Sequence, residues 1–241
     1  MTFDIQFAVQ AFPQILTGVP VTLLVTVCSI LIGLILGSLL NHLQSHRVPF
    51  WGGFCKVYVS FFRSTPLIVQ LYVAYFSLPQ LADTVLRKNA GSAVNPDVFP
   101  PLLCALLVFS LNTAAYMSEL IRSALSSVDA GQLEACYSVG MTTWQSYRRI
   151  VFPQAFIEAI PNIGNMFLSL IQGTSLAYSI KLMEIMAEAK ILASYGLRYI
   201  EAYADASVVY WILCLLFSAL FKIAEQKFSL SKKPTEKAFQ F

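Results

Sequence analysis

The sequence predicts an all-α membrane protein with five transmembrane helices. Hydrophobic residues make up 57% of the 241 residues and charged residues only 12%, whereas soluble domains carry about 25% charged residues. Residues 21–40 contain no charge, and roughly 20 apolar residues of helix cross the bilayer core. Helices satisfy their own backbone hydrogen bonds in lipid, and the alternating pattern of an outer-membrane barrel is not seen.

Five segments are long and apolar enough to be these helices. They are residues 16–40, 57–81, 98–125, 154–179 and 206–224. Pro100 and Pro101 fit the start of the third helix, where a missing N–H breaks no helical hydrogen bond. Pro161 lies inside the fourth helix, where proline tends to kink the chain. No internal repeat divides the sequence.

The distribution of Lys and Arg predicts an N-out, C-in topology. Basic residues favour the cytoplasmic side of a membrane. With the N-terminus outside, eleven of the 16 Lys and Arg residues fall on the cytoplasmic side and five fall outside. The cytoplasmic group includes Arg47, Arg63 and Lys233. The first residues lack the basic stretch of a removable signal peptide, so we expect the first helix to serve as the targeting signal.

Other classes of function receive little support from the composition. The net charge of +3 is too small to indicate a nucleic-acid ligand, and no GxxxxGK[ST] motif for nucleotide binding occurs. The five cysteines show no CxxC spacing and fit small apolar positions. His42 and His46 have the i, i+4 spacing of metal ligands, but no carboxylate accompanies them, so we expect no metal site.

The connection between the third and fourth helices, residues 126–153, is long and rich in helix-forming residues. Short helices are expected over 130–139 and 142–150, with Gly140 supplying a left-handed turn between them. Tyr137 and Trp144 leave this segment partly apolar. It is therefore either a docking surface for another protein or a helix lying on the membrane.

Polar residues recur on one face of the third and fourth helices. Asn112, Tyr116 and Glu119 are spaced four and three apart. A second stripe comprises Glu158, Asn162, Asn165, Ser169 and Gln172. Because polar groups at membrane depth are costly, they usually face a cavity or a partner. These stripes indicate either a substrate path or interhelical hydrogen bonding, including a Glu119–Arg122 pair. We interpret Arg63 as a cytoplasmic anchor and Glu158 as a helix-start acid.

Several motifs resemble the ABC importer permeases. Glu134-Ala135-Cys136, Gly140, Ile150 and Pro153 match their Glu-Ala-Ala, three residues, Gly, nine residues, Ile-x-x-Pro loop, with Cys136 replacing the second alanine. Within this group, the chain most resembles the polar amino-acid permeases. These include the histidine, glutamine, arginine and cystine importers. The matching runs are Phe62-Arg63-Ser64-Thr65-Pro66, Ala115-Tyr116 with Glu119 and Arg122, Pro161-Asn162 with Gly164-Asn165, and Thr174-Ser175-Leu176. These runs lie between residues 62 and 176, and the resemblance as a whole extends over residues 18–225.

The resemblance implies a type I ABC importer permease fold, with cytoplasmic coupling helices between the third and fourth helices. It implies one transmembrane permease domain over residues 1–241, with a core at 16–226 and a coupling loop at 126–153. The implied partners are a second permease chain, identical or different, two ATPase subunits, an extracytoplasmic amino-acid-binding protein and membrane lipid, but no nucleic acid. The chain itself is expected to be non-catalytic and free of cofactors, with ATP and Mg on the partner ATPase, and to lie in the bacterial inner membrane.

The resemblance and the polar stripes together give the candidate site residues. The substrate path comprises Asn112, Tyr116, Glu119, Asn162, Asn165, Ser169, Gln172, Thr174 and Ser175. ATPase coupling involves Gln132, Glu134, Ala135, Gly140, Ile150 and Pro153. Gln172-Gly173 departs from the Lys-Asp or Lys-Asn of the family, so substrate contacts there are not carried over.

The expected function is import of a polar amino acid, with cystine as one candidate. The alternative is a secondary transporter or channel subunit driven by an ion gradient. That class commonly has midplane acids and repeated halves. Glu119 is the single candidate acid here, and no repeat is seen.

Overall fold

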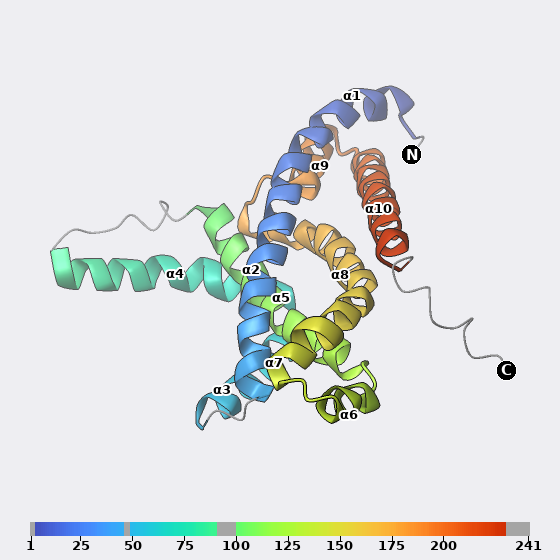
Figure 1. The fold of residues 1–241 in the computed structure, drawn as a ribbon. Coiled ribbons are helices and arrows are strands. Elements are labelled where there is room, and N and C mark those ends of the chain that lie inside the picture. Colours follow the sequence, from blue (N-terminus) through green and yellow to red (C-terminus); the bar gives the residue numbers. More distant parts are fainter. Residues whose placement is uncertain (1–2, 46–48, 91–99, 230–241) are drawn as a thin grey trace.

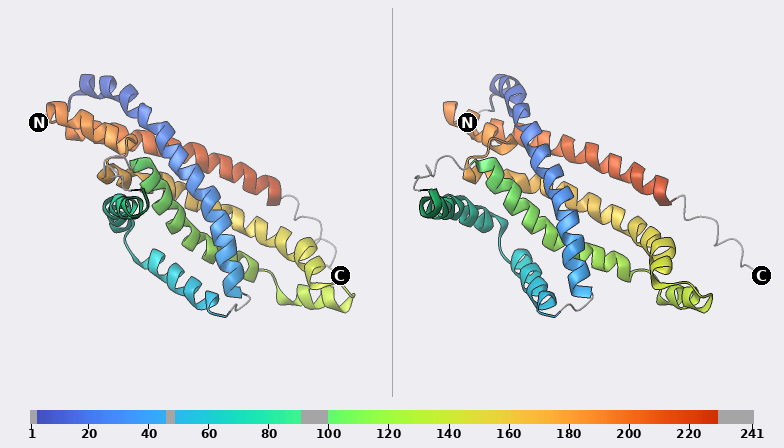
Figure 2. Two further views of the ribbon diagram at one scale, coloured as in Figure 1. Left: turned by 90° about the vertical axis from the view of Figure 1, so that its left-hand side faces the viewer. Right: turned by 60° about the vertical axis from the view of Figure 1, so that its left-hand side comes forward.

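The computed structural model describes residues 3–45, 49–90 and 100–229, with side chains described outside 85–90 and 229. Within these ranges the regular elements are helices. They are α1 (Ile5–Ile15), η1 (Leu16–Gly18), α2 (Val19–Ser45), α3 (Trp51–Ser64), α4 (Leu67–Ala90), α5 (Pro101–Ser126), α6 (Ala130–Ser138), α7 (Thr143–Ser146), η3 (Tyr147–Val151), α8 (Phe152–Gly173), η4 (Thr174–Ile180), α9 (Ile185–Gly196) and α10 (Tyr199–Ser229). They form an elongated bundle with α1 and α9 at one end and α6 and α7 at the other (Figures 1 and 2).

The first helix begins earlier than the sequence pattern predicted. Asp4 caps α1 by accepting a hydrogen bond from the Phe7 backbone N–H at 3.1 Å. The helix then continues through η1 into α2, so the apolar span covers Ile5–Ser45 rather than starting at residue 16. In α2, glycines allow close approach to α5, because a Cβ at Gly33 would lie 2.5 Å from Thr113 Cγ2.

The second predicted helix, 57–81, is wrong as a single straight element. The chain bends by 107° between α3 and α4. Thr65, the residue before Pro66, is extended at φ −100° and ψ 139°, as proline requires of its predecessor. The Gln70 amide nitrogen lies 3.1 Å from the Phe62 carbonyl oxygen and 2.7 Å from Thr65 Oγ1, which stabilises the corner. As a result, α4 projects sideways from the bundle (Figure 1).

The later helices follow the prediction with changes at their ends. The third helix is confirmed as α5, with Pro101 in its first turn. Pro161 lies inside α8 without interrupting it, and the last turns of the predicted fourth helix are the 3₁₀ segment η4. The fifth, α10, starts at Tyr199 instead of residue 206. The helix α9 (Ile185–Gly196) was not predicted from the sequence.

Three described helical spans are long and apolar enough to cross a membrane, or four if α3 and α4 count as one bent span. They are Ile5–Ser45, Pro101–Ser126 and Tyr199–Phe228. The described helix α8 is not among them, although it has 22 residues. Its polar stripe accounts for this, since each polar residue lowers the mean hydropathy. The predicted count of five therefore depends on how α3, α4 and α8 lie in the membrane.

A buried carboxylate ties α9 to α10. Glu184 is fully buried and caps α9 by accepting hydrogen bonds from the Met186 and Ala187 backbone N–H groups at 3.0 and 2.8 Å. The Tyr210 hydroxyl of α10 donates to the same carboxylate at 2.6 Å. Burial raises the pKa of Glu184, and these hydrogen bonds oppose the rise.

Candidate functional site

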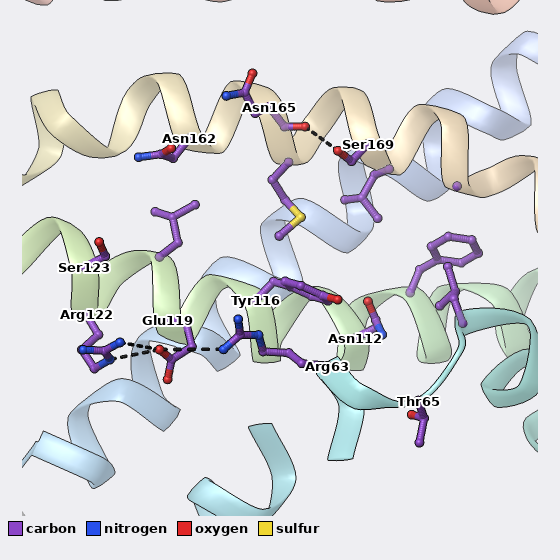
Figure 3. A pocket seen from close by; sticks show the side chains of 16 residues that line it. Arg63, Thr65, Asn112, Tyr116, Glu119, Arg122, Ser123, Asn162, Asn165 and Ser169 are labelled. Carbon is purple, nitrogen blue, oxygen red and sulfur yellow. Dashed lines mark hydrogen bonds and ion pairs between the residues drawn. The ribbon is translucent and has the colours of Figure 1, made fainter. Parts of the chain in front are cut away.

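A cavity of about 730 Å³ lies between α5 and α8, beside the α3–α4 corner (Figure 3). We call it the central cavity. Six of the predicted substrate-path residues line it from these two helices: Asn112, Tyr116, Glu119, Asn162, Asn165 and Ser169. The two polar stripes predicted from helical spacing therefore face each other across one space.

The remaining three predicted path residues do not face the central cavity. Gln172 and Ser175 line a separate hollow of about 410 Å³ beside Trp211 and Cys214 of α10. Thr174 is fully buried and donates a hydrogen bond to the Ile171 carbonyl oxygen at 2.7 Å. Gly173 is the residue that lines the central cavity at this level.

Three charged side chains meet on one wall of the central cavity. The Arg122 guanidinium donates two hydrogen bonds to Glu119 Oε2, at 2.7 and 3.0 Å, so the i, i+3 pair is present. Arg63 Nη1 lies 3.9 Å from the same oxygen, and its guanidinium lies over the Tyr116 ring, 5.5 Å from the centroid. Figure 3 shows Arg63 between Tyr116 and Glu119.

Arg63 lines the central cavity, whereas its position in the sequence predicted a cytoplasmic anchor. It lies on α3, and the bend at Pro66 turns the following chain away while leaving the end of α3 against α5. No spacing within one helix could relate Arg63 to Glu119. The signal available in the sequence was Pro66 itself, since the residue before a proline avoids helical geometry.

The polar residues of both walls are partly engaged within the protein. The Asn112 amide donates to the Phe62 carbonyl oxygen and to Gln70 Oε1, at 3.0 and 3.1 Å, linking α5 to the α3–α4 corner. On α8, Ser169 donates to the Asn165 carbonyl oxygen at 2.9 Å. Asparagine amides and hydroxyls keep further donor and acceptor positions when one is used. The cavity therefore offers both kinds of hydrogen-bonding group.

The predicted coupling segment is a pair of short helices at the far end of the bundle. Residues 130–138 form α6, and Gly140 has a φ of 79°, which confirms the left-handed turn. Thr142 caps α7 through a capping box with Gln145. Tyr137, Val139 and Trp144 are 48%, 76% and 65% exposed. An apolar surface of this kind suits docking to another molecule.

The second short helix does not end before Pro153. The turn at α7 continues through the π-helical segment η3 directly into α8, and Pro153 sits in the first turn of α8. Gln132 and Gln154 exchange hydrogen bonds between their amide groups, which joins α6 to α8. Glu134 and Ala135 are exposed, Ile150 is half-buried, and Cys136 is buried beneath them.

No group of three possible metal-ligating side chains occurs among the described residues. His46, one member of the spaced histidine pair, lies outside those residues.

Residues 29–230 match the family described as the binding-protein-dependent transport system inner membrane component. The probable amino-acid permease protein YxeN of Bacillus subtilis (strain 168) is 40% identical over 228 residues, covering 95% of this chain and 97% of the relative. The L-cystine transport system permease protein TcyL of the same organism is 35% identical over 225 residues, covering 93% and 91%.

Solved structures show the same fold. An amino acid ABC transporter crystallised with histidines is 28% identical, with a TM-score of 0.82, and the match covers 94% of this chain and all of that chain. A subunit of the methionine ABC transporter MetNI is 19% identical with a TM-score of 0.67, covering 89% of this chain and 95% of that chain.

Proposed function

Because the chain belongs to the binding-protein-dependent transport system inner membrane components, with the fold of a type I ABC importer permease, we propose that it forms half of the path of an amino-acid importer. It is a non-catalytic permease subunit, and ATP is hydrolysed on a separate ATPase subunit. The proposed substrate is a polar amino acid, with cystine as a candidate from the similarity to TcyL.

The observation that carries this proposal is the central cavity. Its walls bring amide, hydroxyl and charged groups together between α5 and α8. An amino acid carries an ammonium and a carboxylate and so needs both acceptors and donors. Asn112, Tyr116 and Glu119 on α5, facing Asn162, Asn165 and Ser169 on α8, supply both. We assign no substrate contact to Gln172, Thr174 or Ser175.

We further propose five membrane crossings, with the N-terminus outside and the C-terminus inside. In this arrangement the α3–α4 pair is one bent crossing and α8 is a crossing whose polar face lines the path. The basic-residue tally supports it, although Arg47, Lys232, Lys233 and Lys237 lie outside the described residues. The whole of residues 1–241 then acts as one permease domain in a bacterial inner membrane, surrounded by lipid.

Coupling is proposed to occur at α6, Gly140 and α7. The segment of residues 126–153 would place Gln132, Glu134, Ala135, Gly140, Ile150 and Pro153 at the contact with one ATPase subunit. The complete importer would comprise a second permease chain, identical or different, two ATPase subunits that hold ATP and Mg, and an extracytoplasmic binding protein that delivers the amino acid. The exposed Tyr137 and Trp144 support the docking role.

The test is reconstitution of the chain with its ATPase and binding protein in proteoliposomes. We expect the ATPase to co-purify with the chain, and one or more amino acids from a panel that includes cystine to stimulate ATP hydrolysis and to accumulate in the vesicles. Omitting the binding protein is the control. Accumulation driven by an ion gradient without ATP would support the secondary-transporter alternative and refute the proposal.

A further inference from the structure

The two ends of the central cavity differ in chemistry. Arg63, Glu119 and Arg122 gather at one end, whereas Phe109 and Leu67 bound the other end, next to Gly173. Phe109 and Glu119 are ten residues apart on α5, so about 15 Å of helix separates the two ends. In Figure 3, Arg122 and Glu119 lie toward one side, with Asn112 and Thr65 toward the other.

The charged end has free capacity for both ionic groups of an amino acid. Within the described part of the chain, Arg63 donates no hydrogen bond, and its closest charged contact is the 3.9 Å approach to Glu119 Oε2. Its side chain is 44% exposed. A guanidinium binds a carboxylate through two parallel hydrogen bonds. Both Arg122 bonds also fall on Oε2 of Glu119, which leaves Oε1 available to an ammonium.

The opposite end has no charge, and its polar side chains each donate a hydrogen bond within the protein while keeping acceptor positions. Thr65 donates to the Phe61 carbonyl oxygen at 2.8 Å, Asn112 donates to the Phe62 carbonyl oxygen, and Ser169 donates to the Asn165 carbonyl oxygen. Phe109 and Leu67 are apolar. A charged side chain placed here would lose hydration without gaining an opposite charge, whereas an uncharged polar side chain can use the remaining acceptor positions.

Gly173 enlarges this end. Its φ of −63° and ψ of −28° are ordinary helical values, so the backbone does not require glycine here. A Cβ added at Gly173 would lie 3.7 Å from Phe109 Cε1 and 3.9 Å from Leu67 Cδ2, which is normal van der Waals contact. Glycine inside a helix costs roughly 0.5–1 kcal/mol relative to alanine. What the glycine provides is space in the cavity.

We propose that the central cavity holds its amino acid in one orientation, with the carboxylate at Arg63, the ammonium at Glu119 and the side chain in the space beside Gly173. This orientation favours amino acids whose side chains are long and carry no net charge. The inference rests on the proposed function and adds the substrate class and the direction of binding. It also makes Arg63 a substrate-binding residue and Gly173 the residue that sets side-chain length.

The test uses a thiol placed at the uncharged end. In the purified permease–ATPase complex carrying Leu67→Cys, which leaves Gly173 and its space intact, the rate of labelling by a small thiol reagent is measured with citrulline, arginine or alanine present at millimolar concentration, and the labelled site is identified by mass spectrometry. Citrulline and arginine have side chains of similar length and differ in charge. We expect citrulline to slow labelling about tenfold at saturation, and alanine and arginine to slow it less than about twofold.

Two further variants separate the parts of the inference. Gly53→Cys is the matched control, because a Cβ there meets no atom within 4 Å and Gly53 does not line the central cavity; its labelling should not respond to any amino acid. Adding Arg63→Gln to Leu67→Cys should abolish protection by citrulline, and Arg63→Lys should restore part of it. Co-purification of the ATPase verifies that each variant is assembled.

Each contrary result has a distinct meaning. Protection by alanine as strong as by citrulline would overturn the role of Gly173, and protection that survives Arg63→Gln would overturn the role of Arg63. If amino acids stimulate ATP hydrolysis by the wild-type importer but none protects the introduced thiol, the inference fails and the proposed function stands. If no amino acid stimulates hydrolysis or accumulates, the proposed function itself fails.

Discussion

The two ends of the helical bundle are held in opposite ways. At the α1–α9 end, Glu184 is fully buried and bonded to α10, and Arg198 bridges Asp4 and Glu201 at 3.1 and 3.6 Å. At the α6–α7 end, Tyr137 and Trp144 are largely exposed. The first end therefore completes its contacts within the chain, whereas the second presents side chains that another molecule can bury. The difference separates residues that hold the fold together from residues that we propose for docking.

The largest effect is expected from Gly18→Ala at the α1–α9 end. The added Cβ would lie 2.4 Å from the Ile185 backbone nitrogen and 2.5 Å from the Glu184 carbonyl carbon, and backbone atoms cannot rotate away. Overpacking typically costs about 1–3 kcal/mol, and a clash with backbone belongs at the top of that range. We expect little assembled complex, measured by size-exclusion chromatography in detergent. Gly53→Ala is the control, and normal assembly of Gly18→Ala would show that this end is less rigid than we infer.

Gly140→Val at the α6–α7 end should reduce transport without reducing assembly. The left-handed φ of 79° at Gly140 is costly for a β-branched residue, about 1–3 kcal/mol, so the turn should rearrange. No atom lies within 4 Å of a Cβ added at Gly140. The expected effect of the substitution therefore comes from backbone conformation and not from steric crowding. We expect about a tenfold loss of uptake at unchanged yield. Gly140→Asn, which tolerates this conformation better, should retain most uptake, and equal loss in both variants would refute the conformational explanation.

Glu184→Gln should reduce assembly less than Gly18→Ala, although its amide nitrogen cannot accept the hydrogen bonds that one carboxylate oxygen accepts, and it should change the pH dependence of stability. Because burial raises the pKa of Glu184 in the folded chain, the protonated form is favoured by folding. Its stabilising contribution is present at pH values below the unfolded pKa of about 4.3 and is lost as pH rises through the raised folded pKa.

The uncharged amide side chain that this substitution introduces should remove that loss, because it does not titrate. We expect the wild-type melting temperature to fall relative to the variant as pH rises through the window above about 4.3. Parallel melting profiles across this range, measured by thermal unfolding in detergent, would contradict the assignment.

The sequence predicted the parts of the molecule that depend on local rules. Pro101 marked the start of α5, and Gly140 marked a left-handed turn after α6. The short helix α9 was missed because its ends are set by Glu184 and by Leu197 in the left-handed conformation, neither of which follows from hydrophobic periodicity. The α3–α4 bend could have been predicted from Pro66, but the apolar stretches on both sides of Arg63-Ser64-Thr65-Pro66 were treated as one helix.

The sequence could predict those site residues that are related by their spacing along a single helix. The α8 stripe was drawn with alternating steps of four and three, which is a 3.5-residue period. An α-helix has 3.6 residues per turn and drifts about 20° per heptad from that period. By Gln172 the stripe has turned toward α10, and Gly173 has taken its place in the central cavity. Arg63 reaches the cavity from another helix, so its position required the tertiary structure.

The unbroken run from α7 through η3 into α8 has a mechanical consequence. No turn separates Trp144 from Asn162. The exposed surface of α7 and the α8 wall of the central cavity therefore belong to one continuous helical run. The opposite wall, α5, is connected to α6 by a short non-helical link at residues 127–129. Hydrogen bonds between Gln132 and Gln154 hold α6 against α8. If α6 and α7 dock as proposed, we expect a force on Trp144 to act on Asn162 and Asn165 through this continuous helical run, and on Glu119 only through the 127–129 link.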